Sequence, residues 1–135
     1  MKTEEIMAIP VTHRDLLDKP GIAHLATVGQ DGLPYSSAMW YEWDGEHLLF
    51  STLKSRQEYQ NLRTNPSLAV SIVDPDCSNH LLQVDGIALL EEEPHGELIG
   101  ALVRKYHGEG VSQWDEPGVE RVTLKLKVLR VSCAG

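Results

Sequence analysis

The residues best suited to chemistry form a short basic cluster, with Lys54 and Arg56 on either side of Ser55. We expect Ser55 to cap a helix that runs from Arg56 to about Thr64, since a serine hydroxyl satisfies free N–H groups in a first helical turn. A helix N-terminus attracts anions, and an arginine holds a phosphate through two parallel hydrogen bonds. Because the other basic residues are scattered, the sequence predicts one site for a small molecule that carries a phosphate.

Other catalytic sets are missing from the sequence. No serine, histidine and aspartate, and no cysteine and histidine, stand in a pattern that favours a covalent nucleophile. Cys77 and Cys133 are far apart and form no CxxC pair, and the six histidines lie one per segment, without the spacing of metal ligands. We therefore expect ordinary thiols, no metal site and no catalytic residue that the sequence alone identifies.

Size and charge restrict the class of protein. The chain has 135 residues, of which 41% are hydrophobic, and this predicts one domain with its own core. No apolar run approaches the roughly 20 residues of a membrane-spanning helix. The net charge of −8 opposes binding to a polyanion, and the polar, acidic segment 1–9 is unlike a secretory signal. We expect a soluble cytoplasmic protein that binds neither nucleic acid nor membrane.

The elements that must position the basic cluster are mostly strands. The segment 33–43 alternates throughout, with Ser37 and Met39 on one face and Trp40 on the other. Asp44-Gly45 predicts a hairpin, and Gly86 predicts a bulge or sharp bend inside a strand. We expect strands at 22–28, 33–43, 47–52, 68–73, 80–90 and 120–131, and helices from a Thr12 cap to Asp18, at 56–64 and at 95–107.

These strands are expected to form a barrel. Antiparallel strands of this number and length close best as a small barrel, because closure leaves no exposed sheet edge, and the helices then lie outside it. In the last strand, the residues expected to face the core are Val122, Leu124, Leu126 and Val128.

Several motifs occur in an order and spacing that resemble a known superfamily. They are Ile22 to Val28 with a Gly-Gln-Asp-Gly turn and Pro34, then Met39 to Gly45, then Phe50-Ser51-Thr52 with Ser55-Arg56-Gln57, Asn61-Leu62 and Asn65-Pro66, then Asp74-Pro75-Asp76 and Val84-Asp85-Gly86. Together they resemble the FMN-binding split β-barrels of the pyridoxamine 5′-phosphate oxidase class. The branch they resemble most is the one that uses the deazaflavin coenzyme F-420.

The resemblance implies a six-stranded antiparallel split β-barrel with peripheral α-helices, paired as a homodimer with FMN or deazaflavin in the cleft between subunits. It also implies an oxidoreductase that acts on a small conjugated organic molecule by hydride transfer, in which the cofactor performs the chemistry. The cofactor-binding residues that it implies, for the ring and then for the phosphate end, are Ser37, Met39, Trp40, Ser51 and Thr52, and Lys54, Ser55, Arg56 and Gln57.

Two departures from the family pattern bear on the ligand. Family members commonly carry a lysine three residues before the Asn-Leu pair, where this chain has Glu58, and a carboxylate repels a phosphate. Either Lys54 and Arg56 compensate, or the affinity is weak, or the pocket has changed its ligand. The vitamin B6 oxidase also has an arginine-bearing C-terminal motif that this chain lacks before Gly135, so we do not expect oxidation of pyridoxamine phosphate.

Other interpretations stay open. Met39 and Trp40 are also explained as barrel core, and the hydroxyls of Ser51 and Thr52 as solvent-facing groups. Packing within the chain is the expected role of Tyr106, His107 and Trp114. An alternative function is a non-catalytic flavin- or haem-binding module of the same fold, which the carboxylate of Glu58 favours. A small nucleic-acid-binding barrel is a third possibility, against which the acidic composition argues.

Overall fold

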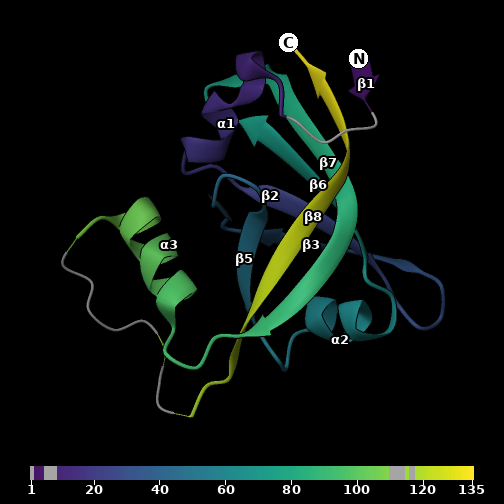
Figure 1. Ribbon diagram of the computed structural model, residues 1–135, viewed down its shortest axis with the longest axis vertical. Helices are drawn as coiled ribbons and strands as arrows, with labels where there is room; N and C mark the ends of the chain where they lie inside the picture. The colour runs from purple at the N-terminus through teal and green to yellow at the C-terminus, as the bar shows by residue number, and fades with distance from the viewer. Residues whose placement is uncertain (1, 5–8, 110–114, 116–117) are drawn as a thin grey trace.

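The computed structural model describes residues 2–4, 9–109, 115 and 118–135 (Figure 1). The strands are β1 (Lys2–Glu4), β2 (Ala23–Val28), β3 (Pro34–Met39), β4 (Glu42–Trp43), β5 (Leu48–Leu53), β6 (Ser67–Asp74), β7 (Cys77–Glu92) and β8 (Arg121–Ala134). The helices are α1 (Asp15–Asp18), α2 (Gln57–Thr64) and α3 (Glu97–His107), and a 3-10 turn (Val11–His13) precedes α1.

The strands form one antiparallel sheet of eight strands that curls into a half-barrel (Figure 1). Their order is β3-β2-β6-β7-β8-β5-β4, and β1 pairs with β8 beside this path. β3 and β4 stand at opposite ends of the order, yet only Trp40 and Tyr41 separate them in the chain. This two-residue link therefore brings the two ends of the sheet together.

The expected mainly β fold with peripheral helices is confirmed, but the expected count of six strands is wrong. The strand predicted at 33–43 is interrupted at Tyr41 and forms both β3 and β4, and β1 adds a further strand. At the interruption, the backbone N–H of Tyr41 donates to the hydroxyl of Tyr106 at 3.1 Å. The fully buried side chain of Tyr41 donates to the carbonyl of Leu16 at 2.5 Å. These contacts fix the chain where it leaves one sheet edge for the other.

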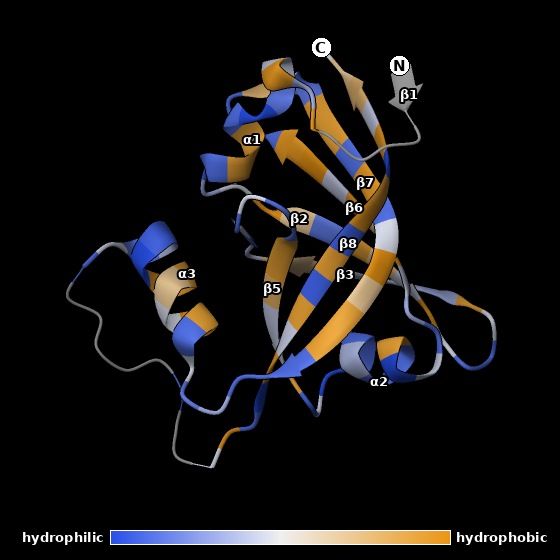
Figure 2. Cartoon of the chain, in the orientation of Figure 1, coloured by the Kyte–Doolittle hydropathy of each residue, from blue (hydrophilic) through white to orange (hydrophobic). Residues whose placement is uncertain are grey.

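Side chains that alternate along the strands build the core. Leu25, Phe50, Ile72 and Val84 come from four different strands and are almost fully buried. Figure 2 shows hydrophobic segments alternating with polar ones along β8. The prediction for this strand is confirmed at Val122, Leu124 and Leu126, which are buried, and Val128 is half-buried against the core. Each buried leucine or valine stabilises the fold by about 1.5–3 kcal/mol.

The irregularity predicted at Gly86 is confirmed as a shift in the register between β7 and β8, next to Asp85. A Cβ atom at Gly86 would collide with the backbone carbonyl oxygen of Lys127 on β8. Only glycine lacks a Cβ atom, so the close approach of the two strands at this bulge requires it.

The cap predicted at Ser55 is wrong. Helix α2 begins at Gln57, its N-cap is Arg56 in an extended conformation, and no side chain caps it. The backbone N–H of Arg56 donates to the carbonyl of Leu53 at 3.0 Å. This turn places Ser55 before the helix, one residue too early to reach its free N–H groups.

The other helices also begin later than the sequence predicts. The N-cap of α1 is Arg14 and not Thr12, because a 3-10 turn occupies the segment before it. Helix α3 begins at Glu97 after Gly96, whose positive φ of 63° ends the preceding turn. None of the described helices is long and apolar enough to cross a membrane.

Candidate functional site

A pocket of about 350 Å³ lies where β3, β5, α2 and α3 approach one another. Its volume falls within the range of small-molecule sites, roughly 300–1,000 Å³. Figure 1 shows β5 running between α3 and α2. We call this cavity the β3–β5 pocket, and its lining residues are Ile22, Tyr35, Ser36, Ser37, Ala38, Met39, Trp40, Ser51, Thr52, Leu53, Arg56, Glu58, Ile99, Leu102 and Arg121.

The pocket brings together most of the residues that the sequence predicts for the cofactor. The predicted residues that line it are Ser37, Met39, Trp40, Ser51, Thr52 and Arg56. They come from β3, the link after it, β5 and the front of α2, so the curled sheet is what places them together. The predicted residues that do not line it are Lys54, Ser55 and Gln57.

One wall of the pocket is apolar and aromatic. Ile99 and Leu102 reach it from α3, and Trp40 stacks on Tyr106 with ring centroids 4.8 Å apart and ring planes at 13°. The Tyr106 hydroxyl donates to the carbonyl of Gly21 at 2.7 Å. Burial raises the pKa of Tyr106 to about 12, so this hydroxyl keeps its proton near neutral pH. A flat, fixed wall of this kind suits a planar conjugated ring.

The hydroxyl groups of Ser51 and Thr52 on β5 both donate hydrogen bonds within the chain. Ser51 donates to Glu93 Oε1 and Thr52 donates to Glu58 Oε1, each at 2.9 Å. Both hydroxyls belong to buried residues, so they are not the solvent-facing groups that the alternative interpretation expects. A hydroxyl that gives its proton to a carboxylate keeps its oxygen lone pairs. Towards a ligand, these two side chains therefore act as acceptors.

Glu93 does not line the pocket, but it binds two residues that do, Ser51 and Ile99, and the sequence analysis missed it. Its side chain is 3% exposed, and it accepts hydrogen bonds from Thr123 Oγ1 at 3.1 Å and from the backbone N–H of Ile99 at 2.9 Å, as well as from Ser51. A buried carboxylate needs such donors to offset its lost hydration. The available signal was an acidic run immediately before a helix, but that run does not identify which glutamate turns inward.

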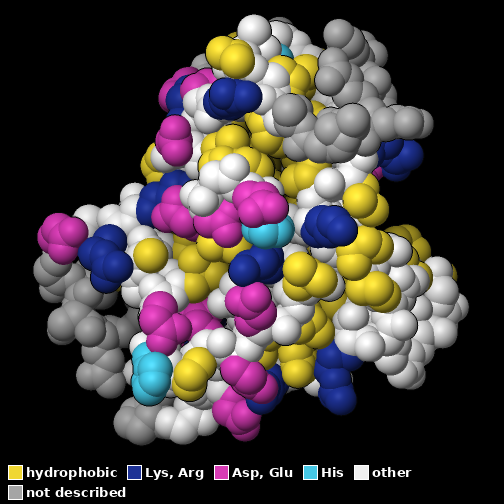
Figure 3. Space-filling view, in the orientation of Figure 1, with side chains coloured by type: hydrophobic (Ala, Val, Ile, Leu, Met, Phe, Trp, Pro, Cys, Tyr) yellow, Lys and Arg dark blue, Asp and Glu magenta, His cyan; other side chains and the backbone are white. Residues whose placement is uncertain are grey.

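The cationic groups near the pocket differ in what they already bind. Arg56 lines it and is exposed, and no side chain in the described part of the chain pairs with it. Arg121 also lines it, but its guanidinium holds both carboxylate oxygens of Asp115 at 2.8 Å. Figure 3 shows lysines and arginines interspersed with acidic side chains on the face drawn. Arg56 is therefore the cation most available to a ligand.

Lys54 lies outside the pocket and is ion-paired. Its ammonium is 2.7 Å from Glu92 and 3.2 Å from Glu120, and its hydrogen bonds to these carboxylates raise the pKa of Lys54 above its ordinary value. Ser55 is exposed and does not line the pocket. Of the two cations predicted to bind the cofactor phosphate, Arg56 therefore lines the pocket, whereas Lys54 pairs with neighbouring carboxylates.

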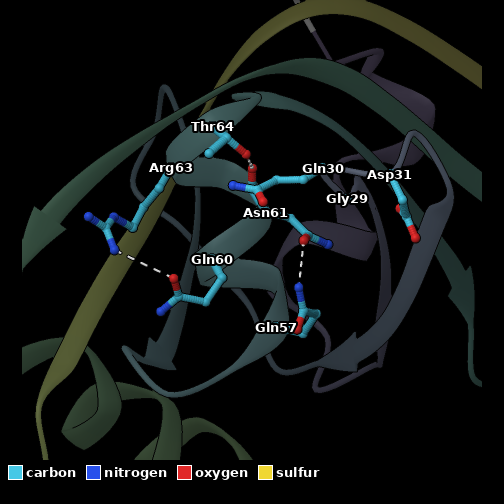
Figure 4. Close-up of a pocket in the computed structure, with 8 residues that line it drawn as sticks. All are labelled: Gly29, Gln30, Asp31, Gln57, Gln60, Asn61, Arg63 and Thr64. Atoms are coloured by element: carbon cyan, nitrogen blue, oxygen red, sulfur yellow. Dashed lines mark hydrogen bonds between the residues drawn. The ribbon is translucent and has the colours of Figure 1, made fainter.

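Gln57 belongs to a second, polar pocket of about 580 Å³ on the far side of α2 (Figure 4). Its lining residues are Gly29, Gln30, Asp31, Gln57, Gln60, Asn61, Arg63 and Thr64. Figure 4 shows Gln57 beside Asn61, and its Nε2 donates to Asn61 Oδ1 at 2.8 Å, while Asn61 Nδ2 donates to Thr27 at 3.0 Å. The first hydrogen bond joins Gln57 to Asn61 within α2, and the second joins α2 to β2.

Aromatic residues of the third helix pack within the chain, as expected. Tyr106 stacks on Trp40, and the ring of His107 meets Trp40 edge-on with centroids 5.2 Å apart. The third residue of this prediction, Trp114, lies outside the described residues. Trp40 thus joins the pocket wall to α3.

A cluster of titratable groups lies away from the pocket. Asp15, Asp74 and His80 offer ligand atoms within 4.8 Å of one another. The ammonium of Lys19 lies 2.9 Å from Asp74 and 3.8 Å from Asp15. Because this cation already neutralises the carboxylates, the cluster is an ion-pair network that ties α1 to the end of β6.

The fold is similar to those of several solved structures. An F420 reductase has a TM-score of 0.83 and 35% identity, with 92% of this chain and 98% of that chain covered. A conserved hypothetical protein of Mycobacterium tuberculosis has a TM-score of 0.74 and 25% identity over 96% and 86%. HupZ of Group A Streptococcus has a TM-score of 0.68 and 20% identity over 93% and 94%, which shows the fold alone.

Sequence comparison agrees with the structural likeness. A search of curated protein sequences gives no match. A profile of the pyridoxamine 5′-phosphate oxidase family, by contrast, matches residues 9–132, nearly the whole chain. The profile and the F420 reductase together confirm the resemblance expected from the motifs. The chain therefore belongs to the pyridoxamine 5′-phosphate oxidase family, whose members include flavin- and deazaflavin-related oxidoreductases.

Proposed function

We propose that the protein is an oxidoreductase that binds FMN or a deazaflavin in the β3–β5 pocket and transfers a hydride to or from a small conjugated organic molecule. The observation that carries this proposal is the convergence on one pocket of residues that the sequence motifs assign to the cofactor. The 35% identity with an F420 reductase supports a deazaflavin, and the match to the pyridoxamine 5′-phosphate oxidase family supports FMN as the alternative.

The polar groups of the pocket suit the ring of such a cofactor. Ser51 and Thr52 each have an acceptor oxygen, and because their side chains point to opposite faces of β5, one of the two would match the N–H group of a flavin-type ring. The Oγ atom of Ser37 is the one buried side-chain oxygen or nitrogen that lacks a hydrogen-bond partner within the described residues. A buried hydroxyl without a partner is unfavourable, and a ligand beside β3 would supply one.

The cofactor, when bound, supplies the hydride chemistry, and the chain supplies position. Met39 and Trp40 would pack against the ring, while Ile99 and Leu102 exclude water from its surroundings. Arg56 would hold an anionic tail, for which it has a free guanidinium.

A binding titration tests this proposal. We expect FMN or coenzyme F-420 to bind to the native protein, with quenching of cofactor fluorescence as the readout. Arg56→Ala should weaken the binding about tenfold or more, since a hydrogen bond to a charged group contributes about 1.5–3 kcal/mol. Arg63→Ala is the matched control, because Arg63 is exposed on α2 and does not line this pocket. If neither cofactor binds at high micromolar concentration, the proposal is lost.

We also propose that two copies pair as a homodimer and close the open side of the pocket. β3 ends the sheet order and has only β2 as its partner among the described strands. Its exposed residues Tyr35, Ser36 and Ala38 line the pocket. Light scattering after size-exclusion chromatography should give twice the mass of the chain, and the mass of a single chain would contradict the pairing.

A second candidate function is binding without turnover. The carboxylate of Glu58 in the pocket favours it, since a negative charge near the cofactor weakens the grip on a phosphate. Binding of a flavin or haem, with no oxidation or reduction across a panel of quinones, tetrapyrroles and nitro compounds, would favour this candidate over the enzyme.

A further inference from the structure

Glu58 has an unusual position for a charged residue. It lies in the first turn of α2, its side chain is 2% exposed, and it lines the β3–β5 pocket. One carboxylate oxygen, Oε1, accepts the hydrogen bond from Thr52 at 2.9 Å. No donor from the described residues reaches the other oxygen, Oε2. Ser37 Oγ is the one fully buried side-chain oxygen or nitrogen without a partner in the described residues, so Glu58 Oε2 retains accessible surface, on a residue that lines a cavity that a ligand can enter.

The first turn of α2 already contains a negatively charged side chain, Glu58. The free N–H groups and the dipole of a helix N-terminus favour one negative charge, and the side chain of Glu58 supplies it. A phosphate at the same place would meet a buried carboxylate in surroundings of low dielectric, where the repulsion of two like charges is strong. The pocket is therefore unsuited to a phosphate at this end.

The only free cation of the described pocket lining lies next to this carboxylate in the chain but does not neutralise it. Arg56 and Glu58 both line the pocket, and no ion pair joins them. The pocket consequently offers two separate points of recognition: a strong acceptor at Glu58 and a guanidinium at Arg56. A ligand that satisfies both carries a hydrogen-bond donor and an anionic group on different parts of the molecule.

We propose that Glu58 is a specificity-determining residue, which accepts a hydrogen bond from an uncharged N–H or O–H group of the ligand and excludes phosphate from the front of α2. This inference rests on the proposed function in that the ligand is taken to be flavin-like. The anionic group of the ligand then lies against the guanidinium at the end of the Arg56 side chain, and the first helical turn of α2, which contains Glu58, binds the uncharged part.

The exclusion of phosphate is tested without any cofactor. Inorganic phosphate is titrated into isotope-labelled protein, and the backbone amide signals of residues 57–59 are followed by NMR. We expect these signals to shift in Glu58→Gln and to stay unchanged in the native protein. Glu97→Gln is the matched control, because Glu97 is an exposed acidic residue in the first turn of α3 and does not line the pocket. Equal responses in the native protein and Glu58→Gln, whether shifts or none, overturn the exclusion.

The hydrogen bond to the ligand is tested with riboflavin, which carries no phosphate. Glu58→Met, which keeps the length of the side chain and removes the acceptor, should weaken riboflavin binding about 10- to 100-fold, as expected for a hydrogen bond to a charged group. Glu58→Gln keeps an acceptor oxygen and should lose less. If Glu58 acted only by repelling anions, both variants would bind riboflavin like the native protein, and this result overturns the accepted hydrogen bond.

The two experiments separate the failure of this inference from that of the proposed function. If FMN, riboflavin and coenzyme F-420 all fail to bind to the native protein, the proposed function is wrong. The phosphate titration still shows whether Glu58 excludes phosphate from the first turn of α2. Circular dichroism of each variant confirms that it is folded before either titration.

Discussion

Ser51 and Thr52 are neighbours on β5, yet their hydroxyls donate to two different buried carboxylates, Glu93 and Glu58. Successive side chains of a strand point to opposite faces, so one strand connects the two carboxylates across the sheet. Glu93 joins β5 and β8 to the first turn of α3, and Glu58 joins β5 to the first turn of α2. The two residues thus set the places of both helices that border the pocket.

Replacement of Glu93 tests this role. In Glu93→Ala the hydroxyls of Ser51 and Thr123 and the backbone N–H of Ile99 lose their acceptor. Since a buried donor left without a partner costs about 1–3 kcal/mol, we expect the free energy of unfolding in urea to fall by about 2–4 kcal/mol. Glu93→Gln, which keeps one acceptor oxygen, should lose less.

Glu92→Ala is the control for that measurement. Glu92 is the adjacent residue, and it is exposed, with only a surface ion pair to Lys54. Its replacement should leave the free energy of unfolding almost unchanged. Equal losses for the two alanine variants would contradict a special role for Glu93.

At the scale of elements, the bulge in β7 requires a glycine at position 86. Gly86→Ala places a methyl group against the carbonyl of Lys127, so the two central strands of the sheet must separate. We expect a loss of about 3 kcal/mol or more in the free energy of unfolding, as for other severe steric changes in a core. Urea denaturation followed by tryptophan fluorescence measures it.

The same substitution elsewhere should have the opposite sign. Gly100 lies inside α3, and a Cβ atom there would meet only the end of the Arg104 side chain at 3.5 Å. Because alanine is favoured over glycine in a helix interior by roughly 0.5–1 kcal/mol, Gly100→Ala should stabilise the protein. Destabilisation of similar size by both substitutions would mean that the bulge is not the cause.

The alternation of hydrophobic and polar residues predicted a strand correctly where one face of the strand meets the core along its whole length. The last strand alternates because one face meets the core throughout, and Leu124 and Leu126 are buried as predicted. The segment 33–43 alternates equally well but breaks at Tyr41, because the partner that captures its N–H group is Tyr106, 65 residues away. No pattern within the segment records that contact.

The candidate site follows the same rule. The strand residues and Arg56 could be predicted because they belong to local motifs that the family shares, and they do line one pocket. Lys54 looked equally suitable, but Glu92 and Glu120 reach it from distant parts of the chain. Glu93 and Ile99 were missed because α3 is placed on the pocket by tertiary contacts that a linear pattern does not contain.

For the whole molecule, His80 joins segments that are far apart in the chain. Its Nδ1 lies 3.0 Å from the carbonyl oxygen of Gly135 and its Nε2 lies 3.0 Å from Asp15 Oδ1. Both partners are acceptors, so the protonated imidazolium, which donates from both nitrogens, satisfies both. The hydrogen bond to Asp15 raises the pKa of His80 above its ordinary value of 6.5.

This raised pKa predicts how stability depends on pH. A raised pKa in the folded state means that the contribution of His80 is complete below its ordinary pKa of 6.5 and is lost as the pH rises through the folded value. The free energy of unfolding in urea should therefore decline as the pH rises above about 6.5. The decline should be smaller in His80→Gln and unchanged in His24→Gln, whose side chain is exposed on β2. Parallel curves for all three proteins would contradict the assignment.

The two-residue link between β3 and β4 has a consequence for how the chain matures. Trp40 belongs both to that link and to the wall of the pocket, so the pocket is complete only when the link has brought the two ends of the sheet together. A small molecule that prefers the pocket would bind only after the final closure and would hold the chain in that state by mass action. A filled pocket would therefore indicate a completely folded chain. A shortage of the ligand would shorten the lifetime of the protein.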